Sequence, residues 1–447
     1  MQLLRIKKGY TLRAVGVPSL NLERRKTPDT VAVVPHYIPF IKPRLAVQEK
    51  DAVKTGTLLF ADKHWPELKF RSPGTGIVEA IRLGPRRILE AVVIRLDEKE
   101  THESFEPVSD AALETMGKAD LKSRIQDGGL WALFRELPFR NIPMGANDPP
   151  GIIVTLGTRE PFEPHPSVYL NDASALFRFG LRVLQKLSGH VAVVLPSKYA
   201  VPSTLKEAVT HEVSGHYPCG DAGVFLYRTK TDPKHNRTWT LHGQDLLLLS
   251  RFLREGRYPT QKIVVTAGPK AQNPCHVTVR LGAPLRHIAR TSGSDGAHRF
   301  VVGGVFTGYP ASGEDYLGFH ENAVVVLSED PTPEKWAFFK PGYQKPTYSR
   351  AFWSRLTTRL LPVDTRYHGE ERACIGCGYC AEVCPVDILP QFTYKAAVIG
   401  EMEEALAHGI LDCVECGLCS YVCPSKIDLV HALKRVRADL YREEVHR

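Results

Sequence analysis

Short runs of alternating apolar and polar residues dominate the first hundred positions of the chain. Alternation with a period of two is typical of strands, and proline and glycine residues separate the runs as turns. The predicted strands cover residues 31–35, 44–48, 57–62, 76–81 and 89–96. We therefore predict a β-rich module over residues 1–100.

Over residues 101–258 the spacing of apolar residues changes, with helical spacing in some stretches and continuous apolar runs, typical of buried strands, in others. A helical connector over 101–145 is followed by alternating strands and helices, an arrangement that indicates a largely parallel sheet covered by helices. Asn171 or Asp172 is expected to cap the first long helix of this region. The predicted elements are strands at 151–157, 190–196 and 224–228 and helices at 171–188 and 203–209, with a last helix ending near Gly256.

Strand patterns return over residues 259–330, where the stretch VTVRLGAPLRHI resembles the strand and helix of a β-grasp (SLBB-like) domain. Residues 331–370 are rich in proline, aromatic residues and arginine and are predicted to be a linker. Residues 371–447 form a separate segment that ends in a basic amphipathic helix over 429–444. The predicted fold class is thus α/β and α+β, with several domains.

Two copies of one cysteine pattern lie in this last segment, CIGCGYCAEVCP and CVECGLCSYVCP. Each reads C-x2-C-x2-C-x3-C-P, the run that holds cubane iron–sulfur clusters, and in two-cluster ferredoxins the fourth cysteine ligates the other cluster. The predicted ligand sets are Cys374, Cys377, Cys380 and Cys423 for one [4Fe–4S] cluster, and Cys413, Cys416, Cys419 and Cys384 for the second.

The spacing has a physical reason, because three thiolates two residues apart can lie on one tight loop around a cube. Gly376, Gly378 and Gly417 would allow the backbone angles that such a loop needs. The fourth cysteine and the proline after it are expected to begin a helix. A pair of structural zinc sites is the alternative, but zinc ribbons usually present separated C-x2-C pairs. Disulfides are a weaker alternative.

Composition and charge narrow the class of protein. The chain has 447 residues and a formal net charge of +9, which indicates a membrane surface or an acidic protein partner, or simply a solvated basic surface. No nucleic-acid motif and no signal peptide are recognisable, and the densest apolar run, at 246–249, is too short to span a bilayer. Cys219 and Cys275 are left as free thiols, which fits a reducing cytoplasm.

Several other motifs are absent or incomplete. Neither the dinucleotide nor the NTP-binding glycine fingerprint is present. Gly128 and Gly129 are expected to open a helix whose N-terminus could cradle a flavin phosphate, but the bulky residues that follow would obstruct it. The isolated histidines His36, His216 and His320 are expected to be ordinary core or surface residues. Lys63 lies where a lipoyl or biotinyl carrier has its acceptor lysine, although the interval to Pro73 is too long for a carrier hairpin.

Sequence stretches over nearly the whole chain resemble the NqrA family, one of the subunit families of the sodium-translocating NADH:quinone reductase. They are IKKGYTL, KPRLAVQEKDAVKTGTLLFADK, GLWALFRELPF, HGQDLLLLSRFLREG, VTAGPKAQNPCHVTVRLGAPL and VVGGVFTGYPASGEDYLGFHENAVVVL. The cysteine pairs are instead similar to RnfC of the related Rnf complex, because NqrA of the sodium pump usually lacks them. The stretch YPCGDAG departs from the Rnf pattern, which continues with GGEK.

Both families resemble the flavin-binding subunit of respiratory complex I. The resemblance implies a lipoyl-like first module, an α/β core over 101–258 like that of the flavin subunit, a β-grasp domain over 259–330 and an all-α ferredoxin domain over 371–447. Most glycines of the flavin loop are missing at 128–139, and only Glu160 and Glu163 are acidic in the stretch that follows the next strand. Binding of FMN is therefore not expected, whereas these residues leave the binding of a quinone undecided.

The function that we expect is electron relay through two [4Fe–4S] clusters in a peripheral subunit of an NADH:quinone oxidoreductase complex. The implied partners are membrane subunits of a sodium-pumping or Rnf-type complex, on the cytoplasmic face of the cell membrane, with quinone or NADH reached only indirectly. One alternative is an NADH-oxidising, FMN-binding subunit of the Rnf type. Another is a docking subunit whose clusters only stabilise the fold.

Overall fold

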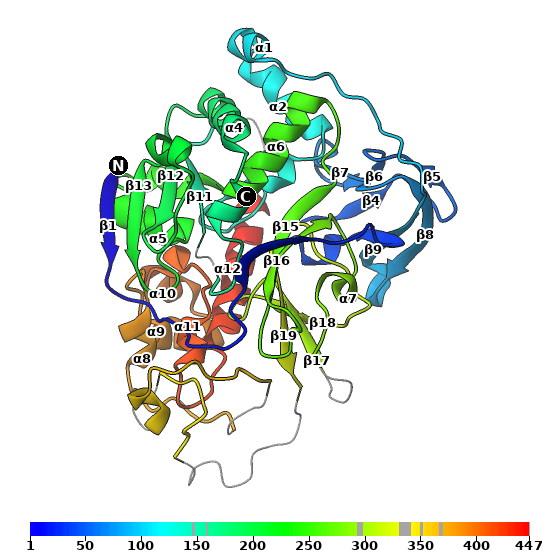
Figure 1. The fold of residues 1–447 in the computed structure, drawn as a ribbon. Coiled ribbons are helices and arrows are strands. Elements are labelled where there is room, and N and C mark those ends of the chain that lie inside the picture. The colour runs from blue at the N-terminus through cyan, green and yellow to red at the C-terminus, as the bar shows by residue number, and fades with distance from the viewer. Residues whose placement is uncertain are drawn as a thin grey trace.

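The computed structural model describes residues 1–144, 148–157, 160–292, 298–329, 341–348, 352–365 and 370–446. Much of the predicted linker, 331–370, falls outside these ranges. The described strands form four sheets, and the described elements after residue 370 are all helical. In Figure 1 the β-rich module and the α/β region lie on opposite sides of a second large sheet, and the last helix, α12, runs into the middle of the molecule.

Residues 30–96 form two small antiparallel sheets around a shared apolar core. Phe60 and Phe70 stack in that core with ring centroids 4.8 Å apart. The five strands predicted here are confirmed, with shifted ends and two further short strands. The first sheet contains β3 (Thr30–Val33), β9 (Leu89–Leu96), β8 (Gly76–Leu83) and β5 (Ala52–Val53), and the second contains β4 (Pro43–Leu45), β6 (Leu58–Asp62) and β7 (Lys69–Arg71).

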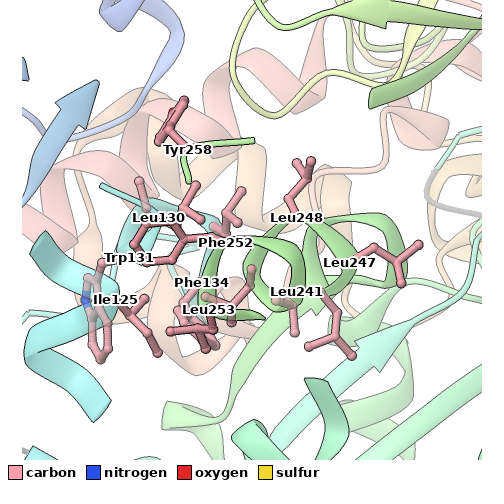
Figure 2. Packing of buried hydrophobic residues seen from close by; sticks show 14 of the residues in the cluster. Ile125, Leu130, Trp131, Phe134, Leu241, Leu247, Leu248, Phe252, Leu253 and Tyr258 are labelled. Atoms are coloured by element: carbon pink, nitrogen blue, oxygen red, sulfur yellow. The ribbon is translucent and has the colours of Figure 1, made fainter. Parts of the chain in front are cut away.

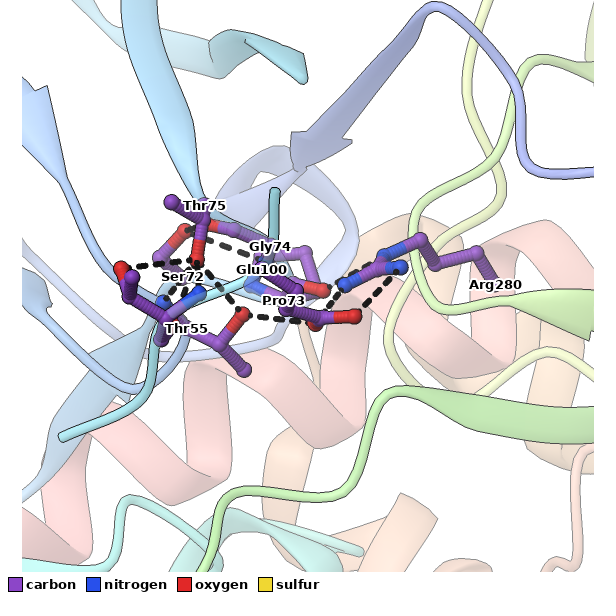
Figure 3. Close-up of polar contacts among 8 residues, drawn as sticks. Thr55, Ser72, Pro73, Gly74, Thr75, Glu100 and Arg280 are labelled. Carbon is purple, nitrogen blue, oxygen red and sulfur yellow. Dashed lines mark hydrogen bonds and ion pairs between the residues drawn. The ribbon is translucent and has the colours of Figure 1, made fainter. Parts of the chain in front are cut away.

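The turn before β8 joins this module to the second large sheet (Figure 3). Arg280, at the end of β16 (Cys275–Arg280), donates from Nε to the carbonyl of Pro73 over 2.9 Å and forms an ion pair with Glu100. The hydroxyl of Thr55 donates to the same carboxylate over 2.9 Å. The S-P-G-T-G stretch is therefore part of a domain interface.

The first two strands of the chain pair outside the β-rich module. β1 (Gln2–Ile6) is parallel to β13 (His211–Gly215), and β2 (Ser19–Arg24) is parallel to β16. The predicted module 1–100 thus contributes its first residues to the two large sheets. Strand alternation alone does not reveal this, because it does not identify a strand's partner.

The α/β region contains the predicted, largely parallel sheet. Its strand order is β1-β13-β12-β11-β14-β10, and of these described strands only β10 (Arg135–Glu136) is antiparallel to its neighbour. Helices α4 and α6 pack against each other beside this sheet, as Figure 1 shows. Other strands and helices of the region are β11 (Ile152–Thr155), β12 (Val191–Pro196), β14 (Trp239–His242), α1 (Asp110–Thr115), α2 (Lys118–Asp127), α3 (Pro166–Tyr169), α4 (Ser174–Leu187) and α6 (Gly243–Glu255).

Three local predictions in this region are wrong. Residues 224–228 belong to a helix, α5 (Ala222–Thr229), because Asp221 caps its first turn by accepting from the Gly223 amide over 2.8 Å. Helix α4 begins at Ser174, so that neither Asn171 nor Asp172 caps it. Residues 203–208 form a 3-10 helix, and the strand β13 is missing from the predicted elements.

The second large sheet is mixed, with the order β18-β17-β19-β15-β16-β2. Its apolar core includes Val264, Val277 and Val324, and a short helix, α7 (Leu285–Ile288), packs on this core through Leu285. The strand patterns expected over residues 259–330 are confirmed by β15 (Gln261–Ala267), β16, β17 (His298–Val302) and β19 (Ala323–Ser328), with β18 (Tyr309–Ala311) as a further short strand.

In the C-terminal region, α8 (Tyr379–Val383), α9 (Pro390–Ile399), α10 (Met402–Ala407) and α11 (Leu418–Tyr421) lie below the α/β region in Figure 1, and α12 (Leu429–His446) rises from them into the middle of the molecule. The expectation that each fourth cysteine begins a helix is wrong. Cys384 instead ends α8, and Cys423 follows α11. No helix among the described residues is long and apolar enough to cross a membrane.

Candidate functional site

Eight cysteines line two adjoining pockets in the C-terminal region. One pocket is lined by Cys374, Cys377, Cys380 and Cys423, and the other by Cys384, Cys413, Cys416 and Cys419 together with Cys380. We call these the outer set and the inner set of four cysteines. Because Cys380 lines both pockets, the two sets are direct neighbours. Each pocket combines three cysteines of one motif copy with the last cysteine of the other.

The loops that carry the cysteines bend at glycines with left-handed backbone angles. Gly376, Gly378 and Gly417 have φ values of +67°, +76° and +77°, which other residues rarely adopt. A Cβ atom on Gly417 would lie 2.8 Å from the carbonyl oxygen of Phe306, so this loop also approaches the second sheet closely.

The two cysteine sets differ in exposure. Cys374 and Cys377 of the outer set are exposed, whereas Cys384 and Cys413 of the inner set are buried. Ile375, between the two exposed cysteines, is itself 71% exposed. The outer set therefore faces solvent and the inner set lies against the protein body.

Burial also affects the protonation of the inner thiols. It raises the pKa of Cys384 to about 11 and the pKa values of Cys416 and Cys419 well above the ordinary thiol value. Bare thiols in this pocket are protonated at neutral pH, so binding of iron must displace their protons.

The donor set fits iron–sulfur cubes. The four thiolates around a cube bind four different irons, whereas the four ligands of a zinc ion converge on one point. Across the part of the chain that the structure describes, no three His, Cys, Asp or Glu side chains converge closely enough to hold a single ion. The two fourfold pockets supply eight sulfur donors, as two cubes require.

Cationic side chains from outside the motifs bind the backbone of the inner set's loops. Arg437 on α12 is 1% exposed and donates to the carbonyls of Cys413 and Pro138. Arg140 donates to the carbonyl of Val414 over 3.4 Å. These contacts fix the 413–416 loop from two sides.

A second group of contacts holds the loop around Cys384. Lys8 donates to the carbonyl of Ala381 over 3.2 Å, and Arg228 donates to that of Pro385 over 2.7 Å. Both cations also pair with Asp387, at 2.9 and 2.8 Å. Burial opposes ionisation of Asp387, yet the hydrogen bond and charge of these cations lower its pKa below the usual value.

The pair of Arg140 and Asp221 connects the inner set to the α/β sheet. Its nitrogen and oxygen lie 2.7 Å apart; the Asp221 side chain is buried, and that of Arg140 is 12% exposed. Burial alone would lower the pKa of Arg140, but the charges of Asp221 and Glu415 raise it. A Cβ atom on Gly223 would lie 2.7 Å from a methyl group of Val414, so glycine at this position allows α5 to approach the cysteine loop.

A cavity of about 550 Å³ lies beside the inner set. Thr155 and His242, at the carboxyl ends of β11 and β14, line its floor, the position where parallel α/β sheets usually bind ligands. Tyr37 of the β-rich module and Tyr309 of the second sheet also line the cavity, and their rings stack with centroids 3.4 Å apart. Glu415 lines this cavity and also the inner cysteine pocket.

The stretch after Gly128 and Gly129 is part of the hydrophobic core (Figure 2). Trp131 is 1% exposed, and its indole nitrogen donates to the carbonyl of Pro143 over 2.8 Å. A Cβ atom on Gly128 would lie 2.3 Å from the ring of Phe252. These residues therefore face apolar side chains of α6 and its neighbours.

The other residues singled out in the sequence lie apart from the cysteines. Lys63 is exposed in the turn after β6, and His36 lies in a short 3-10 turn on the module's surface. His320 lines the cavity, whereas His216 contacts the hydroxyl of Thr11 over 2.7 Å. Glu160 is buried and accepts from the amides of Phe306 and Thr307, and Glu163 lines the cavity.

Sequence reasoning missed Arg140, Asp221 and Arg437, the residues that enclose the inner set. Of these three residues, only Arg437 could have been found from the sequence, because it lies on the apolar stripe of α12 among Leu433, Val436 and Leu440. An arginine on such a stripe indicates a buried partner.

Three family models match separate parts of the chain. They are the NqrA N-terminal barrel-sandwich hybrid domain over residues 4–97, the NqrA second alpha/beta domain over 116–258 and the 4Fe-4S dicluster domain over 373–427. The last match contains all eight cysteines of the two pockets.

Similar proteins include the NqrA component of the Na(+)-translocating NADH-quinone reductase of Saccharophagus degradans, which is 32% identical over 92% of this chain and 92% of its own length. That of a Marinomonas species is 30% identical over 91% of this chain and 92% of its own. Among solved structures, an NAD+-reducing [NiFe]-hydrogenase in the air-oxidized state aligns with a TM-score of 0.33 and 16% identity, over 51% of this chain and 52% of its own.

Proposed function

Because this chain belongs to the NqrA family of the Na+-translocating NADH-quinone reductases and carries a 4Fe-4S dicluster domain, we propose that it is an electron-relay subunit of such a complex. The observation that carries the proposal is the division of eight cysteines into two adjoining fourfold pockets. When bound, two [4Fe–4S] clusters would supply one-electron transfer between the inner and outer positions.

The proposed ligands are Cys384, Cys413, Cys416 and Cys419 for the inner cluster and Cys374, Cys377, Cys380 and Cys423 for the outer one. The crossed sets fit the two-cluster ferredoxin pattern, in which each fourth cysteine serves the other cube. Lys8, Arg140, Arg228 and Arg437 would hold the inner loops through their backbone carbonyls. Fixed loops keep the geometry of a redox centre constant between its oxidation states.

The different exposure of the two cysteine sets supports an assignment of each end of the relay to a different redox partner. The outer set, with Cys374 and Cys377 exposed, would face a redox partner protein. The inner set adjoins the cavity through Glu415, so a small redox molecule such as a quinone would exchange electrons there. The relay would therefore connect the cavity to the outer surface.

We further propose that the α/β core does not hold a flavin. The loop after Gly128 packs Trp131 into the core, and this packing fills the space that a glycine cradle would offer to a phosphate. The first turn of α5 already accommodates the carboxylate of Asp221, paired with Arg140. An anion at this helix end would therefore meet a negative charge. These contacts favour the relay over the NADH-oxidising alternative.

The finer domain scheme is also a proposal. It consists of a lipoyl-like module over 1–100, a core like that of the complex I flavin subunit over 101–258, a β-grasp domain over 259–330, a linker over 331–370 and an all-α ferredoxin domain over 371–447. The proposed partners are the membrane subunits of the complex, with the chain peripheral on the cytoplasmic face. The basic charge of +9 suits such a surface.

The test is anaerobic purification of the full chain, followed by iron, sulfide and flavin determination and EPR after dithionite reduction. We expect about eight irons and eight sulfides per chain, the content of two [4Fe–4S] clusters, together with EPR signals of reduced clusters and no flavin. The variant C275S is a matched control, because Cys275 is buried in the second sheet, away from both pockets. Zinc in place of iron, or stoichiometric FMN reduced by NADH, would refute the proposal.

A further inference from the structure

An ion pair joins the inner cysteine loop to α12, with Glu415 in the second motif copy and Arg437 outside both copies. Arg437 is 1% exposed, and one of its terminal nitrogens lies 3.2 Å from the carboxylate of Glu415. The same nitrogen donates to the carbonyl of Cys413. Glu415 lies between Cys413 and Cys416 in the sequence, so both charges are close to two of the proposed inner ligands.

The two members of this pair come from different parts of the fold. Glu415 lies on the cysteine loop between the cavity and the inner pocket, with its side chain 25% exposed. Arg437 comes from α12, and its second terminal nitrogen donates to the carbonyl of Pro138 in the α/β region. The pair thus brings one positive and one negative charge to the inner pocket along independent routes.

The charged residue near the outer pocket is a different one, Lys426. Lys426 is three residues beyond Cys423, and its ammonium interacts electrostatically with that thiolate. Arg437 and Glu415 do not line the outer pocket. A change at either residue is therefore expected to act mainly on the inner position.

Building on the proposed pair of clusters, we propose that the Arg437–Glu415 ion pair sets the reduction potential of the inner cluster. Reduction adds one negative charge at the cluster, and a nearby cation stabilises the reduced form while a nearby anion destabilises it. The interaction is strong because the pair lies in a largely buried, poorly polarisable region. Arg437 and Glu415 are positioning residues that act through charge, with opposite signs.

Other charges around the inner loops remain as a constant background. They are Arg140 with Asp221, Lys230 with Asp412, and Lys8 and Arg228 with Asp387. None of these residues is altered in the test. A difference between variants therefore reports the charges of Arg437 and Glu415 with their own contacts, which for Glu415 include the interaction with Arg140.

The experiment is an EPR-monitored redox titration of the anaerobically purified full chain and of the variants R437Q and E415Q. We expect R437Q to lower the midpoint potential of one of the two clusters so that its oxidised-to-reduced ratio at a fixed potential rises about tenfold, which is 59 mV for a one-electron couple. We expect E415Q to raise the same midpoint by a similar factor. R437K, which keeps the charge, should retain the wild-type midpoint.

The double variant R437Q/E415Q separates charge from structure. It removes both charges, so the midpoint should return towards the wild-type value although two buried contacts are lost. The variant K426Q is a control that should shift only the other cluster. If R437Q fails to fold, E415Q and the double variant still decide the question.

Two failures are distinguishable. Absence of iron and sulfide from the wild-type chain would refute the proposed relay itself. Full cluster content with unshifted midpoints in E415Q, or with shifts of the same sign in E415Q and R437Q, would overturn the tuning role and leave the relay intact.

Discussion

Replacement of Trp131 by alanine tests the assignment of the 128–134 stretch to the core. The side chain is 1% exposed and packs edge-on against Trp239, with ring centroids 5.4 Å apart. Truncation of a buried aromatic side chain to alanine costs about 3–5 kcal/mol, because apolar contacts are lost and a cavity remains. The indole hydrogen bond to the carbonyl of Pro143 is lost as well.

The variant W131F divides this effect into its parts. Phenylalanine keeps most of the apolar contact but cannot donate, so the carbonyl of Pro143 loses its partner at a cost of about 1–3 kcal/mol. We therefore expect W131F to be destabilised less than W131A. Neither variant should lose iron, since Trp131 does not line either cysteine pocket.

The assay is hydrogen exchange followed by mass spectrometry on peptides from α2 and α6, which pack around Trp131 (Figure 2). Local exchange is suitable because a multidomain chain need not unfold in one transition. The opening free energy of these helices should fall by the amounts given above. A change below about 1 kcal/mol in W131A, or a loss of bound flavin from the variant, would refute the assignment to the core.

Three further predictions concern the cysteine pockets. The variant D221N should destabilise the chain by about 3–5 kcal/mol, because it removes the buried carboxylate that pairs with the largely buried charge of Arg140. Thermal unfolding beside D232N, an exposed aspartate that caps a 3-10 turn, checks this, and equal losses would contradict it. The variant Y217F removes the 2.9 Å hydrogen bond to the Cys416 carbonyl and should lower the free energy of unfolding by about 1 kcal/mol without loss of iron. A fall in the iron content of the variant would contradict this expectation. The variant C374S should lower the iron content from about eight to about four per chain, and an unchanged iron content would refute the ligand assignment.

Much of the chemistry was predictable because it depends on local spacing. The C-x2-C-x2-C-x3-C-P pattern brings three sulfurs onto one loop whatever surrounds it, and Gly376, Gly378 and Gly417 have the left-handed angles that this loop needs. The family resemblance is confirmed by relatives that are 30–32% identical over 91–92% of the chain. The bulky residues after Gly128 likewise indicate a packed stretch.

The sequence pattern gave a wrong element where a helix and a strand can show the same short apolar run. Residues 224–228 are apolar enough for a buried strand, but the cap by Asp221 begins a helix there. Both elements can bury the same short apolar run, so periodicity over five residues cannot separate them. The pairing of β1 with β13 joins residues about two hundred positions apart, and no local pattern encodes such a partner.

The sequence by itself determined the family, the eight cysteines and their two motif copies, because these are properties of residue type and spacing. Only the tertiary structure decided which charges surround each set. Arg140, Asp221 and Arg437 come from three distant segments, and their meeting at the 413–416 loop depends on how α5 and α12 pack. It also exposes Cys374 and buries Cys384 and Cys413, because residues of the α/β region pack on the end of the first motif copy and on the 413–416 loop. A charge acts on a redox centre through distance and burial, and both are set by the packing of the whole chain.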